Sequence, residues 1–276
     1  MQLSWKVFFV FLVVSSCSKE VKPNNAVVVT RHHLATDVGA EILEIGGNAV
    51  DSAVAIAFAL AVVNPSAGNL GGGGFLLYYN ADENKTYALD YRERAPIDAN
   101  ENMFLDADGN VIKNLSLNSY LAAGIPGTVK GMFTIHELFG SKSMDDLISP
   151  SVKLASEGFR LSAFQANNFN KYRKKFLNGS DSESIFINSD DKDFSAGDVF
   201  TQTDLAKSLR LIKDKGQKAF YEGEIAEKIV SDFSDNGGLI TSQDLQDYEV
   251  YFKEPICGDY KQYNVCSMPL PSSGGI

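Results

Sequence analysis

Arg92 is the side chain in this sequence that is best suited to recognise a charged small molecule. It follows residues 86–91, which we expect to form a strand, so its backbone would be held at a strand end. A guanidinium is planar and matches a carboxylate through two parallel hydrogen bonds. The residues alone leave a second interpretation open, in which Arg92 forms a structural ion pair with Asp90 or Glu93. The sequence therefore indicates either a carboxylate-binding arginine or an internal ion pair.

Four consecutive glycines, Gly71–Gly74, lead directly into another expected strand, Phe75–Tyr79. Glycine costs conformational entropy unless the backbone needs a positive φ or a very close approach by another group. A P-loop places its glycines after a strand and opens a helix with Gly-Lys-Ser/Thr. Here an apolar helical segment precedes the glycines and no lysine follows them, so we reject a phosphate-binding loop. The remaining interpretation from pattern alone is tight packing of a helix end against a sheet.

The composition argues against a metal site and a nucleic-acid partner. His32 and His33 are adjacent, neighbours on a strand point to opposite faces, and His136 is the only other histidine. Neither an HExxH motif nor a Cys/His cluster occurs. The net charge of −10 does not suit a nucleic-acid partner, and 44% hydrophobic residues are enough for a folded core. We expect no metal and no other cofactor.

Periodicity and capping residues predict the elements around Arg92. The apolar run Ala49–Val63 predicts a buried helix that begins at Asn48, with Asp51 completing a capping-box-like start, and ends at Asn64-Pro65. The β-branched run at 25–30 predicts a buried strand. Further helices are expected over Ala35–Ile45, from Gly124 through Phe139, and over Met144–Phe159, Ala163–Leu177, Thr203–Lys215 and Ile225–Asp235, with a surface loop over Asn178–Asp198.

Cys257 and Cys266 flank Lys261-Gln262, with a period-2 pattern on both sides. If those two residues form a turn, the cysteines lie directly opposite each other in a non-hydrogen-bonded pair, the closer of the two cross-strand spacings. An oxidising compartment would allow them to pair. Lys-Gln is a poor two-residue hairpin turn, so the register stays open. A disulfide between Cys257 and Cys266 is therefore a hypothesis.

The beginning of the chain predicts export. Lys6 precedes a short apolar run, Val7–Val14, which is too short to span a bilayer as a permanent helix. The sequence VSSC that ends at Cys17 resembles a bacterial lipobox, in which Cys17 would be lipidated. The alternative is an ordinary secretory signal in which this cysteine is incidental.

This interpretation divides the chain into three parts. Residues 1–17 would be a lipoprotein-type signal peptide, 18–25 a polar tether, and 26–276 the folded region. The protein would then be periplasmic or on the cell surface, held to a bacterial membrane by its lipid.

Several segments resemble, in the right order, the large subunit of the γ-glutamyltransferase (glutathione hydrolase) family of N-terminal-nucleophile hydrolases. They are GGNAVDSAVA, NPSAGNLGGGGF, DYRERAP at 90–96, GIPGTVKG at 124–131 and PLPSSGGI at 269–276. The resemblance extends over essentially all of 26–276. It implies an α/β (α+β) fold, the αββα four-layer sandwich of this superfamily, which would be incomplete here and truncated at its C-terminal end.

The family's chemistry depends on a threonine that self-cleavage exposes as a new N-terminus, whose own amine can serve as the base. The resemblance places that threonine downstream of Ile276, so we expect no catalytic residue in this chain and no activity from it alone. Thr30, Thr128 and Thr241 lie in matched structural segments and not at a cleavage junction.

The resemblance also assigns a ligand to Arg92, the α-carboxylate of the γ-glutamyl group in glutathione or another γ-glutamyl compound. For Arg94 we expect only the lesser role of neutralising Glu93. The group would pass through a threonine ester to water or to an acceptor amino acid or peptide. The protein partner would be the small subunit cut from the same precursor.

Three other functions remain open at this point. Related members of the superfamily act as cephalosporin acylases or as polyglutamate-processing enzymes, and the residues that distinguish them lie largely downstream. A lipid-anchored protein without enzymatic activity could use the glycine loop and Arg92 to hold an amino acid. A degraded enzyme that lacks the threonine would have the same sequence up to Ile276.

Overall fold

The computed structural model describes residues 26–177, 182–187 and 192–275. The expected signal peptide (1–17) with Cys17 and the expected tether (18–25) lie outside the described residues. In the part of the chain that the structure describes, no helix has the length and apolar character needed to cross a membrane.

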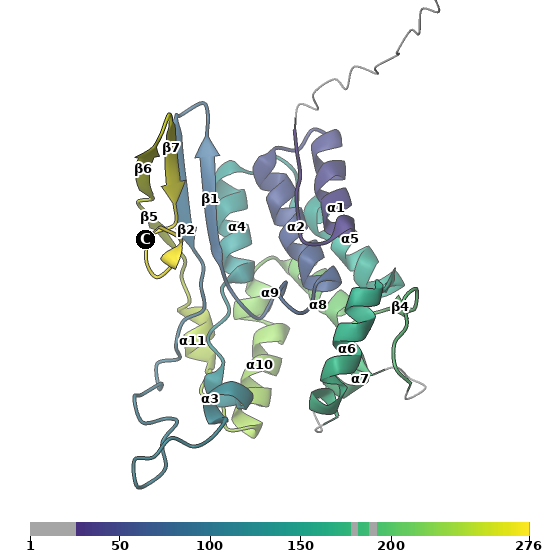
Figure 1. Cartoon of the computed structure of the whole chain (residues 1–276), viewed down its shortest axis with the longest axis vertical. Helices are drawn as coiled ribbons and strands as arrows, with labels where there is room; N and C mark the ends of the chain where they lie inside the picture. Colours follow the sequence, from purple (N-terminus) through teal and green to yellow (C-terminus); the bar gives the residue numbers. More distant parts are fainter. Residues whose placement is uncertain (1–25, 178–181, 188–191, 276) are drawn as a thin grey trace, which may run out of the picture.

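Helices form the larger part of the regular structure and pack side by side next to a small sheet (Figure 1). The longer ones are α1 (His33–Glu44), α2 (Ala49–Val63), α4 (Thr128–Phe139), α5 (Met144–Glu157), α6 (Ala163–Phe176), α8 (Thr203–Lys215) and α10 (Glu224–Asp235). The short ones are α3 (Leu115–Asn118), α7 (Ser182–Phe186), α9 (Lys218–Tyr221) and α11 (Ser242–Gln246). α2 packs against α1, α4 and α5, and α5 packs against α8. The longer helices expected from the sequence are confirmed to within a few residues at each end.

The sheet is antiparallel, with β2 (Lys85–Asp90) between β1 (Phe75–Asn80) and β5 (Tyr251–Lys253). On one face, Tyr78 and Tyr87 contact Phe139 of α4, with ring centroids 4.9 and 4.8 Å apart. On the other face, the side chains of Leu77 and Tyr251 are exposed. The fold is therefore α+β, with helices on one face of the sheet and a second face that is exposed at Leu77 and Tyr251 and buried at Ala88 and Asp90.

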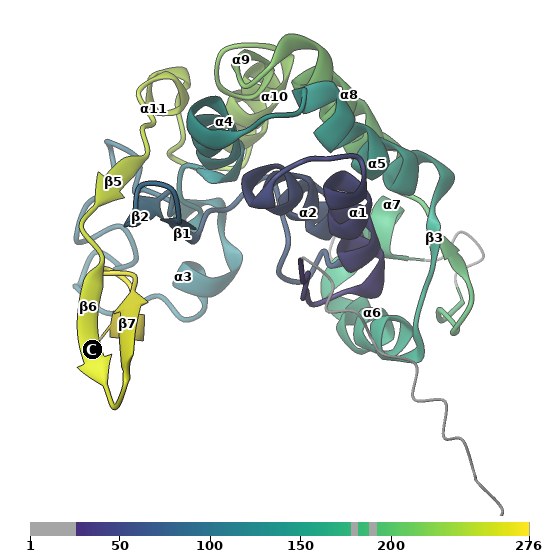
Figure 2. The same ribbon diagram turned by 90° about the horizontal axis from the view of Figure 1, so that it is seen from above.

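The remaining strands form two separate pairs. β3 (Phe159–Arg160) pairs with β4 (Val199–Phe200), and β6 (Ile256–Tyr260) pairs with β7 (Tyr263–Ser267). Figure 2 shows the β6–β7 hairpin beyond β5, on the side of the sheet away from α1 and α2. Cys257 lies directly opposite Cys266 across the hairpin, and the structure contains a disulfide between them, with Cα atoms 4.1 Å apart. The short Cα spacing is that of a non-hydrogen-bonded pair, so the expected register is confirmed.

α2 is the buried centre of the helical layer. Val54, Ala55 and Phe58 are fully buried, as the almost wholly apolar sequence predicts. At its start, Asn48 accepts hydrogen bonds from the backbone N–H groups of Val50 and Asp51, and Asp51 accepts one from the N–H of Asn48. The expected capping box is thus confirmed.

Asp51 also ties α2 to the loop that follows α4. Its carboxylate is fully buried and accepts hydrogen bonds from the backbone N–H groups of Ser141 and Lys142 and from the hydroxyl of Ser141, at 2.6–3.1 Å. Burial alone would raise the pKa of Asp51, but the bonds from Ser141, Asn48 and Lys142 together outweigh it and lower the pKa. The ionised carboxylate is therefore the form that the fold stabilises.

We expect the substitution Asp51→Asn to destabilise the protein by about 2 kcal/mol at pH 7, because hydrogen bonds to a charged group are lost and the amide directs an NH₂ group at an N–H donor. The pKa of Asp51 is lower in the folded state than in the unfolded state. The stability that its ionised carboxylate contributes is therefore present above the unfolded-state pKa near 4, and it is lost as the pH falls through the folded-state pKa. Urea unfolding between pH 7 and pH 3 should show the variant and the parent converging. The control is Asp204→Asn at an exposed carboxylate, for which we expect the free energy of unfolding to differ little from that of the parent. If the difference in free energy of unfolding between Asp51→Asn and the parent does not become smaller in acid, the prediction is contradicted.

The strand expected at 25–30 is wrong. Residues 26–30 are not in a strand, and Val27 and Val29 are 82% and 86% exposed. β-branched residues fit a strand only where a neighbouring strand and a packed face exist, and the described residues supply neither here. The hydroxyl of Thr30 instead bonds to the start of α1. It donates to the carbonyl of His32 and lies 2.8 Å from the hydroxyl of Thr36.

The two adjacent histidines begin α1. Nδ1 of His32 accepts from the N–H of Leu34, which caps the helix, and the rings of His32 and His33 stack with centroids 4.7 Å apart. They do not point to opposite faces, because the segment is not a strand. Within the described ranges, no three His, Cys, Asp or Glu side chains gather as a metal ion would require.

The surface loop expected at 178–198 is partly wrong, because it contains α7 in the portion that the structure describes. Phe186 of this helix lies 5.3 Å from Phe169 and 5.0 Å from Phe176, measured between ring centroids. An aromatic side chain that packs against α6 therefore gives this otherwise acidic segment a local helix.

Candidate functional site

The end of β2 positions Arg92 through Asp90. Asp90 is 3% exposed, and its Oδ2 atom lies 2.7 Å from Nζ of Lys253 on β5. Its Oδ1 atom accepts the backbone N–H of Arg92 at 3.0 Å. An ion pair between two neighbouring strands, in which Asp90 is buried and Lys253 is half-buried, therefore holds the carboxylate that accepts the N–H of Arg92.

Tyr248 fixes the other side of the same residue. Its hydroxyl donates to the carbonyl oxygen of Arg92 at 2.9 Å, across 156 positions of sequence. Tyr248 is 2% exposed. Nothing in the sequence pattern around Tyr248 assigns it a role, but a buried tyrosine hydroxyl needs a hydrogen-bond partner, and this requirement is a signal that points to it.

The side chain of Arg92 itself is exposed and makes no ion pair with any described carboxylate. Asp90 is paired with Lys253, and Oε1 of Glu93 accepts the backbone N–H of Gly73 at 2.8 Å. The structural ion pair considered for Arg92 is therefore wrong within the described residues. The guanidinium is left available to an external carboxylate.

The glycine run packs against the backbone of this segment. A Cβ atom on Gly73 would lie 2.4 Å from the carbonyl oxygen of Tyr91 and 2.9 Å from the carbonyl carbon of Arg92. Gly74 and Tyr91 exchange backbone hydrogen bonds of 3.1 and 3.3 Å, which extend the β1–β2 ladder by one pair. The structure therefore favours the packing interpretation of the glycines, and the close approach is made by the backbone on both sides of Arg92.

A third segment, which leads into α4, completes the arrangement. The carbonyl of Gly72 accepts hydrogen bonds from the N–H groups of Gly127 and Thr128 and from the hydroxyl of Thr128, at 2.7–3.0 Å. Arg94 and Ile125 form an antiparallel bridge. Residues 72–74, 90–94 and 125–128 are thus joined to one another by backbone hydrogen bonds.

Among the described residues, Arg94 forms no ion pair with Glu93, contrary to the expectation. Its guanidinium lies over the ring of Tyr251, 4.1 Å from the centroid, on the face of the sheet away from α4. The expectation is wrong because Glu93 is already engaged by the N–H of Gly73, while an aromatic ring from β5 offers a surface to the planar cation.

Two stacked tyrosines lie behind the site. The rings of Tyr221 and Tyr248 are nearly parallel, 7° apart, with centroids at 5.9 Å. Burial raises the pKa of each hydroxyl well above its usual value; for Tyr248 the cation of Arg94 opposes this, while the charges of Asp90 and Glu93 add to it. Both hydroxyls therefore stay protonated at neutral pH and remain hydrogen-bond donors.

Each threonine considered in the sequence analysis has a structural role. The hydroxyl of Thr128 donates to the carbonyl of Gly72, and the hydroxyl of Thr241 bonds to Asp244 in the cap of α11. The hydroxyl of Thr30 donates to the carbonyl of His32 at the start of α1. Thr128 lies in the segment that packs beside Arg92, but its hydroxyl is taken up by the carbonyl of Gly72.

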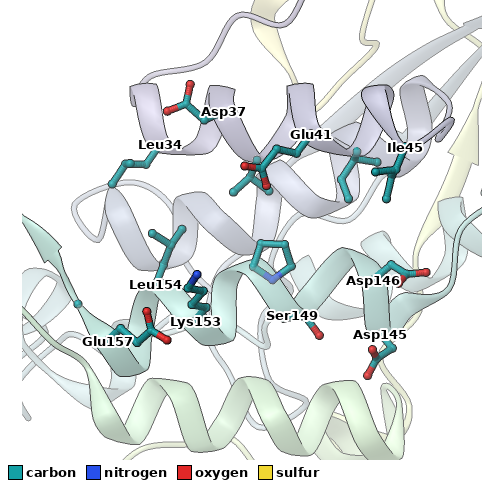
Figure 3. A pocket seen from close by; sticks show the side chains of 14 residues that line it. Leu34, Asp37, Glu41, Ile45, Asp145, Asp146, Ser149, Lys153, Leu154 and Glu157 are labelled. Atoms are coloured by element: carbon teal, nitrogen blue, oxygen red, sulfur yellow. The ribbon is translucent and has the colours of Figure 1, made fainter.

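A separate groove of about 610 Å³ lies between α1 and α5 (Figure 3). Its floor is apolar, with Leu34, Val38 and Leu154 among its lining residues. Its rim carries carboxylates from both helices: Asp37, Glu41, Asp145, Asp146 and Glu157. Arg92 does not line it, so the groove and the glycine–arginine site are different surfaces.

The chain is similar in sequence to known proteins over nearly all of its length. The family model described as Gamma-glutamyltranspeptidase matches residues 35–276. The chain is 46% identical to a glutathione hydrolase proenzyme of Pseudomonas sp. (strain A14) over 267 residues, covering 96% of this chain and 46% of that protein. It is 44% identical to the glutathione hydrolase proenzyme of Escherichia coli (strain K12), covering 93% of this chain and 44% of that protein.

A solved structure shows the same fold. The crystal structure of Helicobacter pylori γ-glutamyltranspeptidase superimposes with a TM-score of 0.88 and 48% sequence identity, over 91% of this chain and 71% of that one. The chain spans about half the length of the curated relatives that it matches. A match that extends over nearly the whole chain, in sequence and in fold, shows the relationship: the chain belongs to the γ-glutamyltranspeptidase family.

Proposed function

We propose that the whole protein, of which this chain forms the front part, is a γ-glutamyltransferase and glutathione hydrolase. It would cleave the γ-glutamyl bond of glutathione and other γ-glutamyl compounds and pass the group to water or to an acceptor amino acid or peptide. The observation that carries the proposal is the 46% identity to a glutathione hydrolase proenzyme across 96% of this chain. The exposed guanidinium of Arg92 supports it, because hydrogen bonds from the backbone N–H to Asp90 and from Tyr248 to the carbonyl hold this residue in place.

The reaction would proceed through an ester on a threonine that is not in this chain. Self-cleavage of the precursor would leave that threonine at a new N-terminus, where its amine, with a pKa near 8, can take the proton of its own hydroxyl. The hydroxyl oxygen would attack the γ-carbonyl, the amine of the leaving group would depart with a proton, and water or an acceptor amine would then release the glutamyl group.

This chain would contribute substrate recognition. Arg92 would pair with the α-carboxylate of the glutamyl group through two charge-assisted hydrogen bonds. The binding surface would be completed by the part of the protein that follows Ile276, the small subunit of the same precursor. The exposed side chains on the second face of the sheet, such as Leu77 and Tyr251, are consistent with a surface that this part would cover.

We propose an extracytoplasmic location for the whole protein. Residues 1–17 have the charge, the apolar run and the terminal cysteine of a lipoprotein-type signal, so Cys17 would carry the lipid anchor. The disulfide between Cys257 and Cys266 suits an oxidising compartment.

The test is to express the complete precursor and to measure three outcomes together: cleavage into two subunits, release of glutamate from a γ-glutamyl anilide or glutathione, and transfer to a dipeptide acceptor. We expect all three, and we expect replacement of the threonine at the new N-terminus by alanine to abolish cleavage and turnover. A folded precursor that binds glutamate without turnover would favour the amino-acid-binding alternative. Turnover of a cephalosporin or a polyglutamate chain in preference to glutathione would favour the related enzymes.

A further inference from the structure

We propose that Tyr248 is a positioning residue for Arg92: through one hydrogen bond to the arginine carbonyl, it sets the direction in which the guanidinium leaves the backbone. The inference rests on the proposed function, in which Arg92 binds the substrate carboxylate. Tyr248 itself is not expected to touch the substrate.

The first step is the geometry at Arg92. The peptide planes before and after a residue meet at its Cα atom, so fixing both planes fixes φ and ψ and thereby the Cα–Cβ direction. Asp90 holds the N–H of the first plane at 3.0 Å, and Tyr248 holds the carbonyl of the second plane at 2.9 Å. Among the described residues, no other group donates to that carbonyl.

The second step is the rigidity of Tyr248. It is 2% exposed and stacks on Tyr221, whose own hydroxyl donates to the carbonyl of Pro126 and accepts the N–H of Lys130. A Cβ atom on Gly127 would lie 2.0 Å from the hydroxyl oxygen of Tyr248, so this glycine leaves the space that the hydroxyl occupies. The donor is thus confined by a ring on one side and by backbone on the other.

The third step is the contrast between the two tyrosines. Both are buried, both are parts of one stack, and each donates to a backbone carbonyl at 2.9 Å. Only the bond of Tyr248 ends on Arg92. Tyr221 therefore provides a control from the same stack, in which the hydroxyl that is removed bonds to Pro126 and Lys130 and not to Arg92.

The test compares Tyr248→Phe with Tyr221→Phe in the complete, processed enzyme. Phenylalanine keeps the ring and the stack and removes the hydroxyl alone. We expect Tyr248→Phe to raise KM for the γ-glutamyl donor roughly fivefold, with kcat changed less than about twofold, because the loss weakens binding of ground state and transition state alike. Each variant loses a buried hydroxyl, so we expect both to lower the melting temperature. We expect Tyr221→Phe to leave KM unchanged.

A second measurement asks whether the effect acts through the arginine. In an Arg92→Lys background, Tyr248→Phe should change KM by less than about twofold, since the group that it positions is no longer there. Equal effects of the two tyrosine variants on KM, or a full effect of Tyr248→Phe in the Arg92→Lys background, would overturn the positioning role. If Arg92→Lys alone leaves KM unchanged, the proposal that Arg92 binds the substrate is wrong. This outcome is therefore distinct from one in which Arg92 binds the substrate but Tyr248 does not position it.

Discussion

Replacing Arg92 with lysine in the complete enzyme should raise KM for γ-glutamyl donors roughly 30-fold. Lysine keeps the positive charge but loses the planar pair of donors, and charge-assisted hydrogen bonds of this kind are worth about 2 kcal/mol. The structure shows why the loss should appear in binding and not in folding: the side chain of Arg92 is exposed and makes no ion pair with any described carboxylate. The measurement is steady-state kinetics with glutathione, together with a thermal melt that should be nearly unchanged.

The matched control is Arg94→Lys, two residues along the same segment. Arg94 stacks on Tyr251, so its replacement should cost some stability and change KM much less than the change at Arg92. If KM rises more at Arg94 than at Arg92, the carboxylate contact has been assigned to the wrong arginine. If neither changes KM, the substrate is not held by this segment.

The helices were predictable because their signals are local. The capping residues of α2 and its apolar sequence lie within sixteen positions, Asn48–Val63, and the structure forms the helix that they predict. The hairpin at Cys257 and Cys266 is local in the same sense, since its two strands are joined by two residues. In contrast, a strand depends on a neighbour that the sequence does not place next to it, and the valines at 26–30 have no such neighbour in the described structure.

The site was predictable in its residue types and not in its connections. The sequence indicates Arg92 and the glycine run, but it leaves the ion-pair interpretation open, because Asp90 and Glu93 are the nearest carboxylates along the chain. The structure excludes that pair by giving each carboxylate a different partner, Lys253 for Asp90 and Gly73 for Glu93. Tyr248, 156 positions from Arg92, could not be linked to it by spacing or periodicity.

The four glycines illustrate the same limit, since pattern alone treats them as equivalent. In the structure, a Cβ atom on Gly71 would meet no described atom within 4 Å, whereas one on Gly73 would meet three backbone atoms at 2.4–2.9 Å. Neither residue has a positive φ, so conformational freedom does not distinguish them. The difference is one of space, and it makes a sharp experimental contrast available within one short run.

We expect Gly73→Ala to destabilise the precursor by about 3 kcal/mol, the upper part of the range for overpacking, because the atoms that must move belong to the backbone of Tyr91, Arg92 and Glu93. Any molecules that still fold should bind γ-glutamyl substrates weakly, since the methyl group displaces the segment that carries the arginine. Urea unfolding and donor KM together measure both effects.

Gly71→Ala is the control in the same run, and we expect it to be neutral or slightly stabilising, because alanine restricts the unfolded chain where the folded backbone tolerates it. Equal losses at both positions would mean that the run is needed for flexibility and not for close approach, which would remove the packing argument for Gly73. A loss of substrate binding at Gly71 with stability unchanged would instead indicate that the open space beside it is occupied by the substrate or by the small subunit. The two substitutions therefore separate the part of the glycine run that holds Arg92 in place from the part that faces outward.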